Sequence, residues 1–269
     1  MHYLDEGPKD GPVVLLLHGN PTWSFMYRNV VEKLKATHRC IAPDHIGCGL
    51  SDKPKASDFP YDLKSHAANV WGLLEYLGIN QFSLVVHDWG GAIGLTAFRH
   101  QLDRIRKLTL LNTAAFNDND VPKRILFCRL PLIGDLFVRG LNGFAWPATF
   151  MASAKGLTQD AKKGLLAPYD NWGNRVAVWR FVKDIPFEGN HPTRPLLNET
   201  ESVLRNLKNI PSVACWGMKD FCFNPDYLKK WKTLIPNLIS HEFHDAGHYI
   251  LEDKCSECVQ IISSFMAGT

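Results

Sequence analysis

Short runs of apolar, often β-branched residues alternate along the chain with longer stretches in which apolar residues recur every three or four positions. The first pattern is typical of buried strands and the second of amphipathic helices. Val70, Leu73, Leu74 and Leu77 illustrate the helical spacing. Strands that alternate with helices of this length indicate βαβ units and a mostly parallel sheet, an α/β fold. The expected strands are 13–17, 39–42, 82–87, 107–111, 212–216 and 240–243, and the expected helices are 23–35, 63–77, 92–100, 225–234 and 252–266.

The alternation is interrupted between about residues 115 and 195. This segment is rich in Phe, Trp, Leu and Arg and has few strand-like runs, and residues 175–182 have helical spacing. We expect a helical lid (residues 115–195) that is inserted into a core made of residues 1–114 and 196–269. Proline-containing segments commonly mark such boundaries, and residues 192–195 begin and end with Pro.

The composition is that of an ordinary globular protein, with 269 residues, 45% hydrophobic and 21% charged. This length fits one large domain or two small ones. The formal net charge is only +3 and no dense basic run occurs, which argues against nucleic acid or an anionic membrane as partner. No apolar stretch is long enough to span a bilayer, and residues 1–7 lack the basic start and apolar core of a signal peptide.

The cysteines favour a reducing, cytoplasmic setting. Their number is seven, which gives no even disulfide framework. Cys255 and Cys258 have the spacing of half a zinc site, but no second pair accompanies them, so we expect two thiols on one helix and no metal. Gly47-Cys48-Gly49 lacks the third glycine of a dinucleotide-binding loop and no P-loop occurs, so we expect no cofactor.

Four polar clusters follow expected strands, where ligands and catalytic groups of open parallel sheets lie. One of them, residues 86–91, has the form of a nucleophile elbow, with Gly90 two places after the residue at its tip. That residue is Asp88, and Val86 replaces the usual small residue two places before it. No G-x-S-x-G motif occurs, which argues against an ordinary serine esterase. The other clusters are residues 18–21, Asp220 and residues 245–248.

Asp88, Asp220 and His248 follow the nucleophile, acid, base order of the α/β-hydrolases. Each has a structural alternative, because Asp88 could cap the next helix, Asp220 could form a turn and His248 could be a structural histidine. Their shared position after strands favours a catalytic triad. A carboxylate that attacks an sp³ carbon forms an alkyl ester, which water activated by His248 can hydrolyse while Asp220 orients the imidazole.

Asn20 and Trp89 offer hydrogen-bond donors beside the expected nucleophile. Their backbone N–H groups are placed to form an oxyanion hole. The side-chain amide and the indole N–H suit a halide or a developing carboxylate as leaving group. The alternatives are that Trp89 is a packed aromatic residue and that Asn20 is a turn former before Pro21.

With these residues the chain resembles the haloalkane dehalogenases over nearly its whole length. The core likeness is carried by residues 18–24 (HGNPTWS), 44–54 (DHIGCGLSDKP) and 87–91 (HDWGG). Other stretches resemble the dehalogenase-related β-lactone decarboxylases of bacterial long-chain olefin biosynthesis. They are residues 112–116, 166–172, 184–186 and 215–221.

This resemblance implies an α/β-hydrolase fold with a lid, and it gives roles to the candidate residues. Asp88 is expected as nucleophile, His248 as base and Asp220 as acid, with Asn20 and Trp89 as the leaving-group pair. The expected reaction converts a hydrophobic cis-β-lactone to an alkene and CO₂. The sequence leaves open whether the nucleophile attacks the carbonyl or the ring carbon that bears oxygen. A complex with upstream enzymes of the olefin pathway is implied by the resemblance alone.

Three alternatives stay open. A haloalkane dehalogenase would need Asn20 and Trp89 as they are. An epoxide hydrolase usually has a pair of lid tyrosines, whereas residues 115–195 contain only Tyr169. A binding or scaffold protein could keep the fold without turnover. By the same resemblance, residues 1–7 match the second strand of the fold, so either the chain is shortened at this end or the sheet edge is exposed or covered by a partner.

Overall fold

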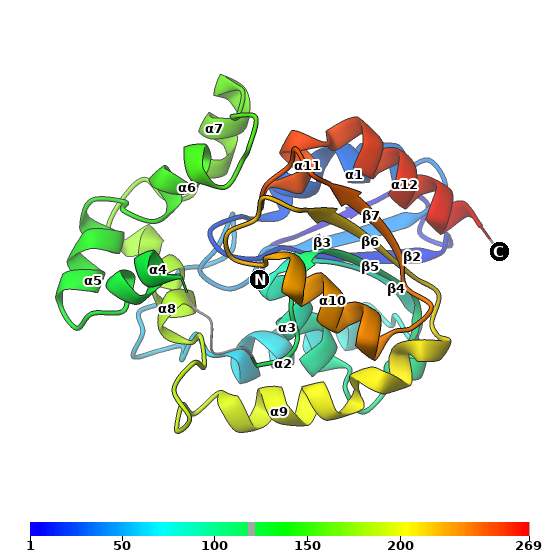
Figure 1. The fold of residues 1–269 in the computed structure, drawn as a ribbon, viewed down its shortest axis with the longest axis horizontal. Coiled ribbons are helices and arrows are strands. Elements are labelled where there is room, and N and C mark those ends of the chain that lie inside the picture. The colour runs from blue at the N-terminus through cyan, green and yellow to red at the C-terminus, as the bar shows by residue number, and fades with distance from the viewer. Residues whose placement is uncertain (118–121, 269) are drawn as a thin grey trace.

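The computed structural model describes residues 1–117 and 122–268; residues 118–121, which fall in the expected lid, and residue 269 lie outside the described residues. In this part of the chain, the strands form one seven-stranded sheet in the order β1-β3-β2-β4-β5-β6-β7 (Figure 1). β1 pairs antiparallel with β3 at one edge, and the other neighbouring pairs are parallel. The strands are β1 (Tyr3–Glu6), β2 (Val13–Leu17), β3 (Arg39–Pro43), β4 (Phe82–Asp88), β5 (Ile105–Thr113), β6 (Ser212–Gly217) and β7 (Ile239–Phe243).

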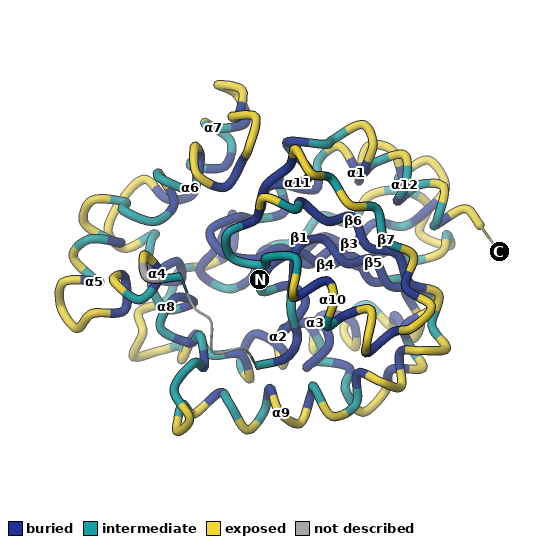
Figure 2. Tube along the Cα trace, viewed as in Figure 1, coloured by how far each residue is buried: buried dark blue, intermediate teal, exposed yellow. Residues whose placement is uncertain are grey.

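Helices cover both faces of the sheet, which confirms the expected α/β-hydrolase architecture. One face carries α1, α11 and α12, and the other carries α2, α3, α9 and α10 (Figure 1). The central strands are buried on both sides (Figure 2), which explains why they are continuous apolar runs in the sequence. These helices are α1 (Arg28–Leu34), α2 (Leu63–Tyr76), α3 (Trp89–Ala97), α9 (Arg194–Val203), α10 (Pro225–Leu234), α11 (Ile250–Asp253) and α12 (Cys255–Ala267).

Three expected helices differ from the observed ones. The helix expected over 23–35 is a 3₁₀ turn (Ser24–Tyr27) followed by α1. The helix expected from residue 92 begins three residues earlier, at Trp89, so the glycines at the elbow belong to its first turn. The helix expected over 252–266 is two helices, α11 and α12, and Lys254 between them has non-helical dihedral angles, φ −134° and ψ 43°. Cys255 and Cys258 lie together on α12, as expected.

A helical insertion follows β5 and lies beside the end of the sheet (Figure 1). It has its own small hydrophobic cluster, to which Tyr169, Val178 and Val182 belong. α8 connects this cluster to the main core, because Ala177 and Phe181 on the same helix pack in the core. The boundaries of the lid stay a prediction. The helices of the insertion are α4 (Lys123–Cys128), α5 (Ile133–Asp135), α6 (Ala145–Met151), α7 (Gln159–Leu166) and α8 (Val176–Lys183), with a π-helical turn (Leu136–Gly140) after α5.

The insertion is tied to the core by a buried carboxylate at the end of α8. Asp184 accepts a hydrogen bond from the Leu63 backbone N–H at the start of α2, 2.7 Å away, and another from the Thr193 hydroxyl. Burial raises the pKa of Asp184 to about 6. Within the described residues, no helix is both long and apolar enough to cross a membrane.

Candidate active site

Asp88 lies at a sharp turn between the central strand β4 and helix α3. Its φ is +52°, in the left-handed region that residues other than glycine rarely adopt. The turn requires close contact with the neighbouring strand: a Cβ on Gly90 would lie 2.0 Å from the Leu17 carbonyl oxygen. Glycine is therefore required at this position, and the expected elbow is present with the carboxylate of Asp88 at its tip.

The carboxylate of Asp88 is held by backbone donors. The Asn20 N–H donates to Oδ1 over 2.6 Å, and the Trp89 N–H also contacts this carboxylate. Gly19 allows the approach, since a Cβ there would lie 2.0 Å from Oδ1. Burial raises the pKa of Asp88 above its ordinary value, whereas His248 and the two N–H groups oppose this shift. The two donors expected to form an oxyanion hole thus both contact the Asp88 carboxylate.

His248 lies between the two carboxylates. Its Nδ1 is 2.8 Å from Asp220 Oδ2, and its Nε2 is 3.7 Å from Asp88 Oδ2. The Cys222 N–H donates to the other oxygen of Asp220 over 2.6 Å. The ring of Phe223 stacks on the imidazole, with 5.8 Å between centroids and 19° between planes. Strands β4, β6 and β7 therefore bring together three side chains that lie far apart in the sequence.

The electrostatic environment of His248 favours its protonated form. Burial alone lowers the pKa of this imidazole. The charge and hydrogen bond of Asp220, together with the charge of Asp88, outweigh burial, so the pKa is raised above its ordinary value. If Asp88 becomes an ester, its charge disappears and the pKa of His248 falls. The same histidine can therefore be a cation before covalent attack and a base after it.

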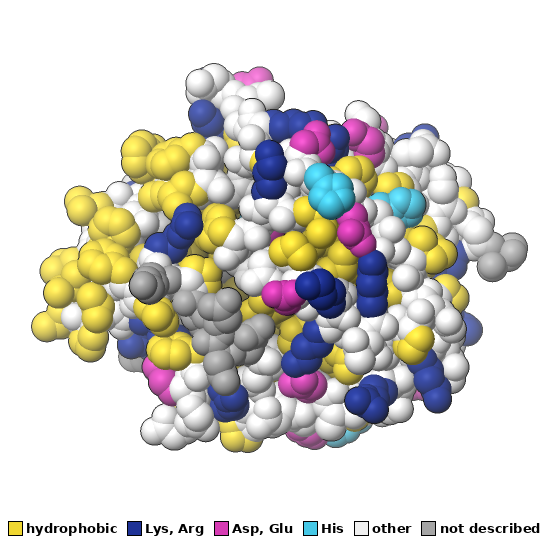
Figure 3. Space-filling view, viewed as in Figure 1, with side chains coloured by type: hydrophobic (Ala, Val, Ile, Leu, Met, Phe, Trp, Pro, Cys, Tyr) yellow, Lys and Arg dark blue, Asp and Glu magenta, His cyan; other side chains and the backbone are white. Residues whose placement is uncertain are grey.

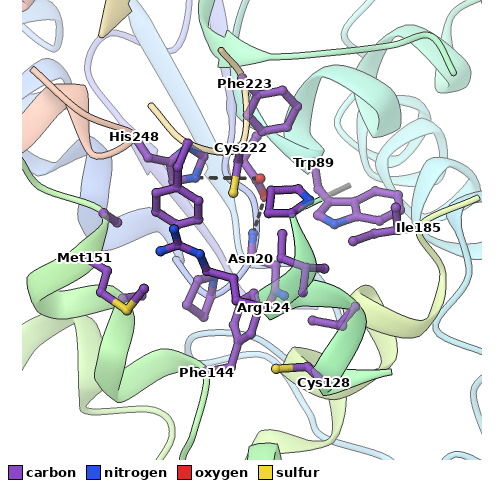
Figure 4. A pocket seen from close by; sticks show the side chains of 18 of the residues that line it. Asn20, Trp89, Arg124, Cys128, Phe144, Met151, Ile185, Cys222, Phe223 and His248 are labelled. Carbon is purple, nitrogen blue, oxygen red and sulfur yellow. Dashed lines mark hydrogen bonds and ion pairs between the residues drawn. The ribbon is translucent and has the colours of Figure 1, made fainter. Parts of the chain in front are cut away.

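Asn20 and Trp89 also lie at the site (Figure 4). The side-chain NH₂ of Asn20 donates to the Val178 carbonyl of α8 over 3.1 Å, which leaves its second hydrogen for another acceptor. The indole of Trp89 packs near Phe181, with 5.4 Å between centroids. The roles of these two residues in leaving-group binding, and those of Asp88, Asp220 and His248 in catalysis, stay predictions.

A cavity of about 530 Å³ opens beside Asp88, between the sheet and the insertion. Most of its lining is apolar and comes from both parts of the chain, for example Ala92 and Leu197 from the core and Phe144 and Ile185 from the insertion. Arg124 of α4 also lines it (Figure 4), and its guanidinium lies 4.1 Å from the centroid of the Phe221 ring. This volume and lining suit a largely apolar small molecule.

Two residues at the site had no assigned role from the sequence. His87, the last residue before Asp88, points its Nε2 at the His248 carbonyl oxygen, 2.8 Å away. Asp253 is buried, and its carboxylate accepts the Gly247 N–H over 2.7 Å and donors from residues 153–155 of the insertion. His87 lies within the HDWGG stretch that carries the family resemblance, so its position could have marked it as a site residue. Asp253 lies in no motif.

Comparison with known proteins agrees with this geometry. The sequence profile described as the alpha/beta hydrolase fold matches residues 12–254. The chain therefore belongs to the α/β-hydrolase family. In solved structures, the chain is similar to haloalkane dehalogenase DbeA from Bradyrhizobium elkanii USDA94, with a TM-score of 0.87 over 99% of this chain and 95% of the other, at 23% identity.

Three relatives are similar over most of their length. A cis-3-alkyl-4-alkyloxetan-2-one decarboxylase from Shewanella oneidensis is 41% identical over 100% of this chain and 86% of its own. One of the same name from Xanthomonas campestris pv. campestris is 38% identical over 99% of this chain and 92% of its own. Haloalkane dehalogenase 2 from Mycobacterium tuberculosis (strain H37Rv) is 33% identical over 94% of this chain and 86% of its own.

Proposed function

We propose that this α/β-hydrolase decarboxylates a hydrophobic cis-3,4-dialkyl oxetan-2-one, a β-lactone, to an alkene and CO₂, with Asp88 as nucleophile. The observation that carries the proposal is the 41% identity over the full chain to a relative with that name, against 33% to a haloalkane dehalogenase. The apolar cavity beside Asp88 supports it, because a lactone with two alkyl chains buries mostly hydrocarbon.

The chemistry proceeds in two steps that balance without another reactant. Asp88 Oδ2 attacks the sp³ ring carbon that is bonded to the ring oxygen. The bond between this carbon and the ring oxygen breaks, and its electron pair stays on the ring oxygen, which becomes part of the carboxylate that forms. The C–C bond to this carboxylate then breaks, CO₂ leaves, the electron pair forms the alkene, and Asp88 is expelled as a carboxylate. Attack from the side opposite the breaking C–O bond lets the new bond to Asp88 lie anti to the C–C bond of the carboxylate. This is the arrangement that the elimination needs.

The surrounding groups support both steps. The second hydrogen of the Asn20 amide and the indole N–H of Trp89 are donors for the carboxylate released by ring opening. His248, held by Asp220, faces the Asp88 oxygen that regains its charge when the alkene forms. The apolar walls disfavour the charged carboxylate relative to neutral CO₂, which promotes decarboxylation.

Water distinguishes this reaction from dehalogenation. The conversion of lactone to alkene and CO₂ consumes no water, whereas an alkyl-Asp88 ester from a haloalkane must be hydrolysed. If turnover of the lactone takes place in H₂¹⁸O, we expect Asp88 to stay unlabelled. Accumulation of ¹⁸O in the Asp88 carboxylate during alkene formation would contradict direct elimination.

The test of function uses purified protein and two substrates in parallel. With a cis-β-lactone that bears two alkyl chains, we expect alkene and CO₂; with 1,2-dibromoethane, we expect negligible halide. Fast halide release without alkene would overturn the proposal in favour of a dehalogenase, the second candidate, which the donors on Asn20 and Trp89 would also suit. Asp88→Asn is expected to abolish turnover and keep the fold, and unchanged turnover would remove Asp88 from the mechanism.

The remaining alternatives have less support. Tyr169, the lid tyrosine that an epoxide hydrolase would use, donates its hydroxyl to the Thr22 carbonyl over 3.1 Å and does not line the cavity. For a scaffold protein without turnover, the discriminating measurement is mass spectrometry of His248→Ala with substrate, where a covalent adduct on Asp88 would exclude that alternative. A cytoplasmic location and a complex with upstream olefin-pathway enzymes are part of the present proposal.

A further inference from the structure

Exposed apolar side chains are concentrated on the insertion. Ten of the thirteen large apolar side chains that are exposed in the described part of the chain lie between residues 127 and 172. Figure 3 shows hydrophobic side chains gathered over the end of the molecule where Figure 1 places α4, α5 and α6. Leu132 is 80% exposed, Leu141 75% and Leu136 61%. We call the exposed apolar surface of residues 127–172 the lid face. Contiguous apolar surface of this kind marks an interaction site.

The lid face lies on the positively charged part of the chain. Residues 115–195 contain eleven Lys and Arg and seven Asp and Glu, a net charge of 11 − 7 = +4, whereas the whole chain is +3. The core is therefore −1. Figure 3 shows Lys and Arg side chains at the border of the apolar surface. The low net charge of the whole chain, which argued against an anionic membrane, hides this asymmetry. Apolar side chains bordered by basic ones are typical of surfaces that bind anionic lipid.

The lid face continues into the cavity. Phe127 and Met151 line the cavity, yet they are 44% and 39% exposed. Apolar surface thus leads from the outside of the insertion to the space beside Asp88. A molecule dissolved in a lipid phase that contacts the lid face would meet apolar side chains that also line the cavity.

We propose that the lid face binds the surface of an anionic lipid bilayer. Leu132, Leu136 and Leu141 insert among the headgroups, and the basic side chains around them contact lipid phosphates. A second copy of the chain is a poorer occupant, because pairing two lid faces would bring two +4 regions together. Binding itself does not depend on the proposed function. The idea that the bilayer supplies a dialkyl lactone and takes up the alkene does rest on the proposed function.

The test is vesicle flotation with purified protein. Vesicles of phosphatidylcholine mixed with phosphatidylglycerol are compared with vesicles of phosphatidylcholine alone, at low and high salt. We expect binding to the mixed vesicles that weakens with salt. The triple variant Leu132→Ser/Leu136→Ser/Leu141→Ser is expected to reduce the partition coefficient at least tenfold, because each serine removes buried apolar surface. None of the three leucines lines the cavity.

A matched control separates this site from general stickiness. Leu50, Tyr76 and Ile239 are also exposed, at 64%, 80% and 59%, but lie outside the lid face. The triple change of these residues to serine is expected to leave flotation unchanged. A second readout is Trp146, 56% exposed on α6, whose fluorescence shifts to the blue on insertion; Trp146→Phe should remove that part of the shift.

Four outcomes would overturn the proposal. They are no flotation with mixed vesicles at low salt, equal loss in the control variant, equal binding to vesicles without phosphatidylglycerol, and a wild-type dimer that the lid-face variant converts to monomer. The last would assign the surface to self-association. Because no outcome depends on turnover, a failed lactone assay and a failed flotation assay are distinguishable.

Discussion

Asp253 connects the loop of the candidate base to the insertion. One carboxylate oxygen accepts the Ser153 hydroxyl and the Lys155 N–H, the latter at 3.1 Å. The other accepts the Ala154 N–H at 2.8 Å and the Gly247 N–H at 2.7 Å. Since Gly247 directly precedes His248, the change Asp253→Asn should loosen the loop of the candidate base and the insertion together.

The magnitude follows from the hydrogen bonds that an amide cannot replace. Asn keeps one oxygen as an acceptor for two of the four donors, and its NH₂ faces the other two. Loss of two charge-assisted bonds costs about 1.5–3 kcal/mol each, about 3–6 kcal/mol in total. At about 2–4 °C per kcal/mol for a chain of this size, the melting temperature should fall on the order of 10 °C.

The assay combines thermal melting with amide hydrogen exchange over residues 152–155 and 247–249. Asp44→Asn is the matched control. Asp44 is fully buried and accepts hydrogen bonds from the Ser24 and Leu50 N–H groups and from His2, but it touches neither segment. It should lose stability without faster exchange in those segments. The reasoning would be refuted by an Asp253→Asn variant with the wild-type melting temperature, or by one whose amide hydrogens in these two segments exchange no faster than in the wild type.

Three further predictions concern the elbow, the attachment of the insertion and the candidate base. Gly19→Ala would place a Cβ 2.0 Å from the Asp88 carboxylate oxygen, so turnover should fall about 100-fold with an unchanged circular dichroism spectrum. Burial raises the pKa of Asp184 to about 6 from an ordinary 3.8, so the folded state holds this proton more tightly, and the free energy of unfolding should fall as pH rises from about 4 to 6; Asp184→Asn should remove this slope in urea titrations. His87→Ala should lower kcat about tenfold through the lost hydrogen bond to the His248 carbonyl, and His87→Gln should restore most of it.

Each of these has a control or a contradicting result. Gly72→Ala is the control for Gly19→Ala, because nothing lies within 4 Å of a Cβ at residue 72. It should leave turnover unchanged and raise the free energy of unfolding by about 0.5–1 kcal/mol. A wild-type rate for Gly19→Ala would show that the carboxylate is not confined. An unchanged pH slope for Asp184→Asn would assign that slope to other groups. If His87→Gln is as slow as His87→Ala, ring packing, not the hydrogen bond, positions His248.

The sequence predicted those parts of the structure that leave a local pattern. Buried parallel strands are continuous apolar runs, so every expected strand was found and the ends were within two residues. The glycine spacing around Asp88 and the order of Asp88, Asp220 and His248 follow from the connections of the fold. These features were therefore predictable from residues that lie close together or follow strand ends.

Features that depend on long-range contacts were not predictable in this way. The start of α3 was placed three residues late, because glycines at residues 90 and 91 usually indicate a turn, whereas here they allow the helix to pack against β2 and β5. Asp253 looked like an ordinary helix residue, because its hydrogen bonds reach backbone groups about 100 residues earlier. The charge asymmetry was hidden because acidic residues of the core cancel the basic ones of the insertion.

The order of the elements along the chain has a consequence for protein synthesis. Residues 1–113 contain five of the seven strands of the described sheet and Asp88, the proposed nucleophile. Asp220 is added 220 − 88 = 132 residues later, after the whole insertion, and His248 is added 248 − 88 = 160 residues after Asp88. A ribosome-bound chain can thus contain its central strands early, but it lacks the proposed base until residue 248 has been added. Nascent fragments that end before residue 220 therefore lack both partners of the proposed nucleophile, whatever the order in which their strands pair.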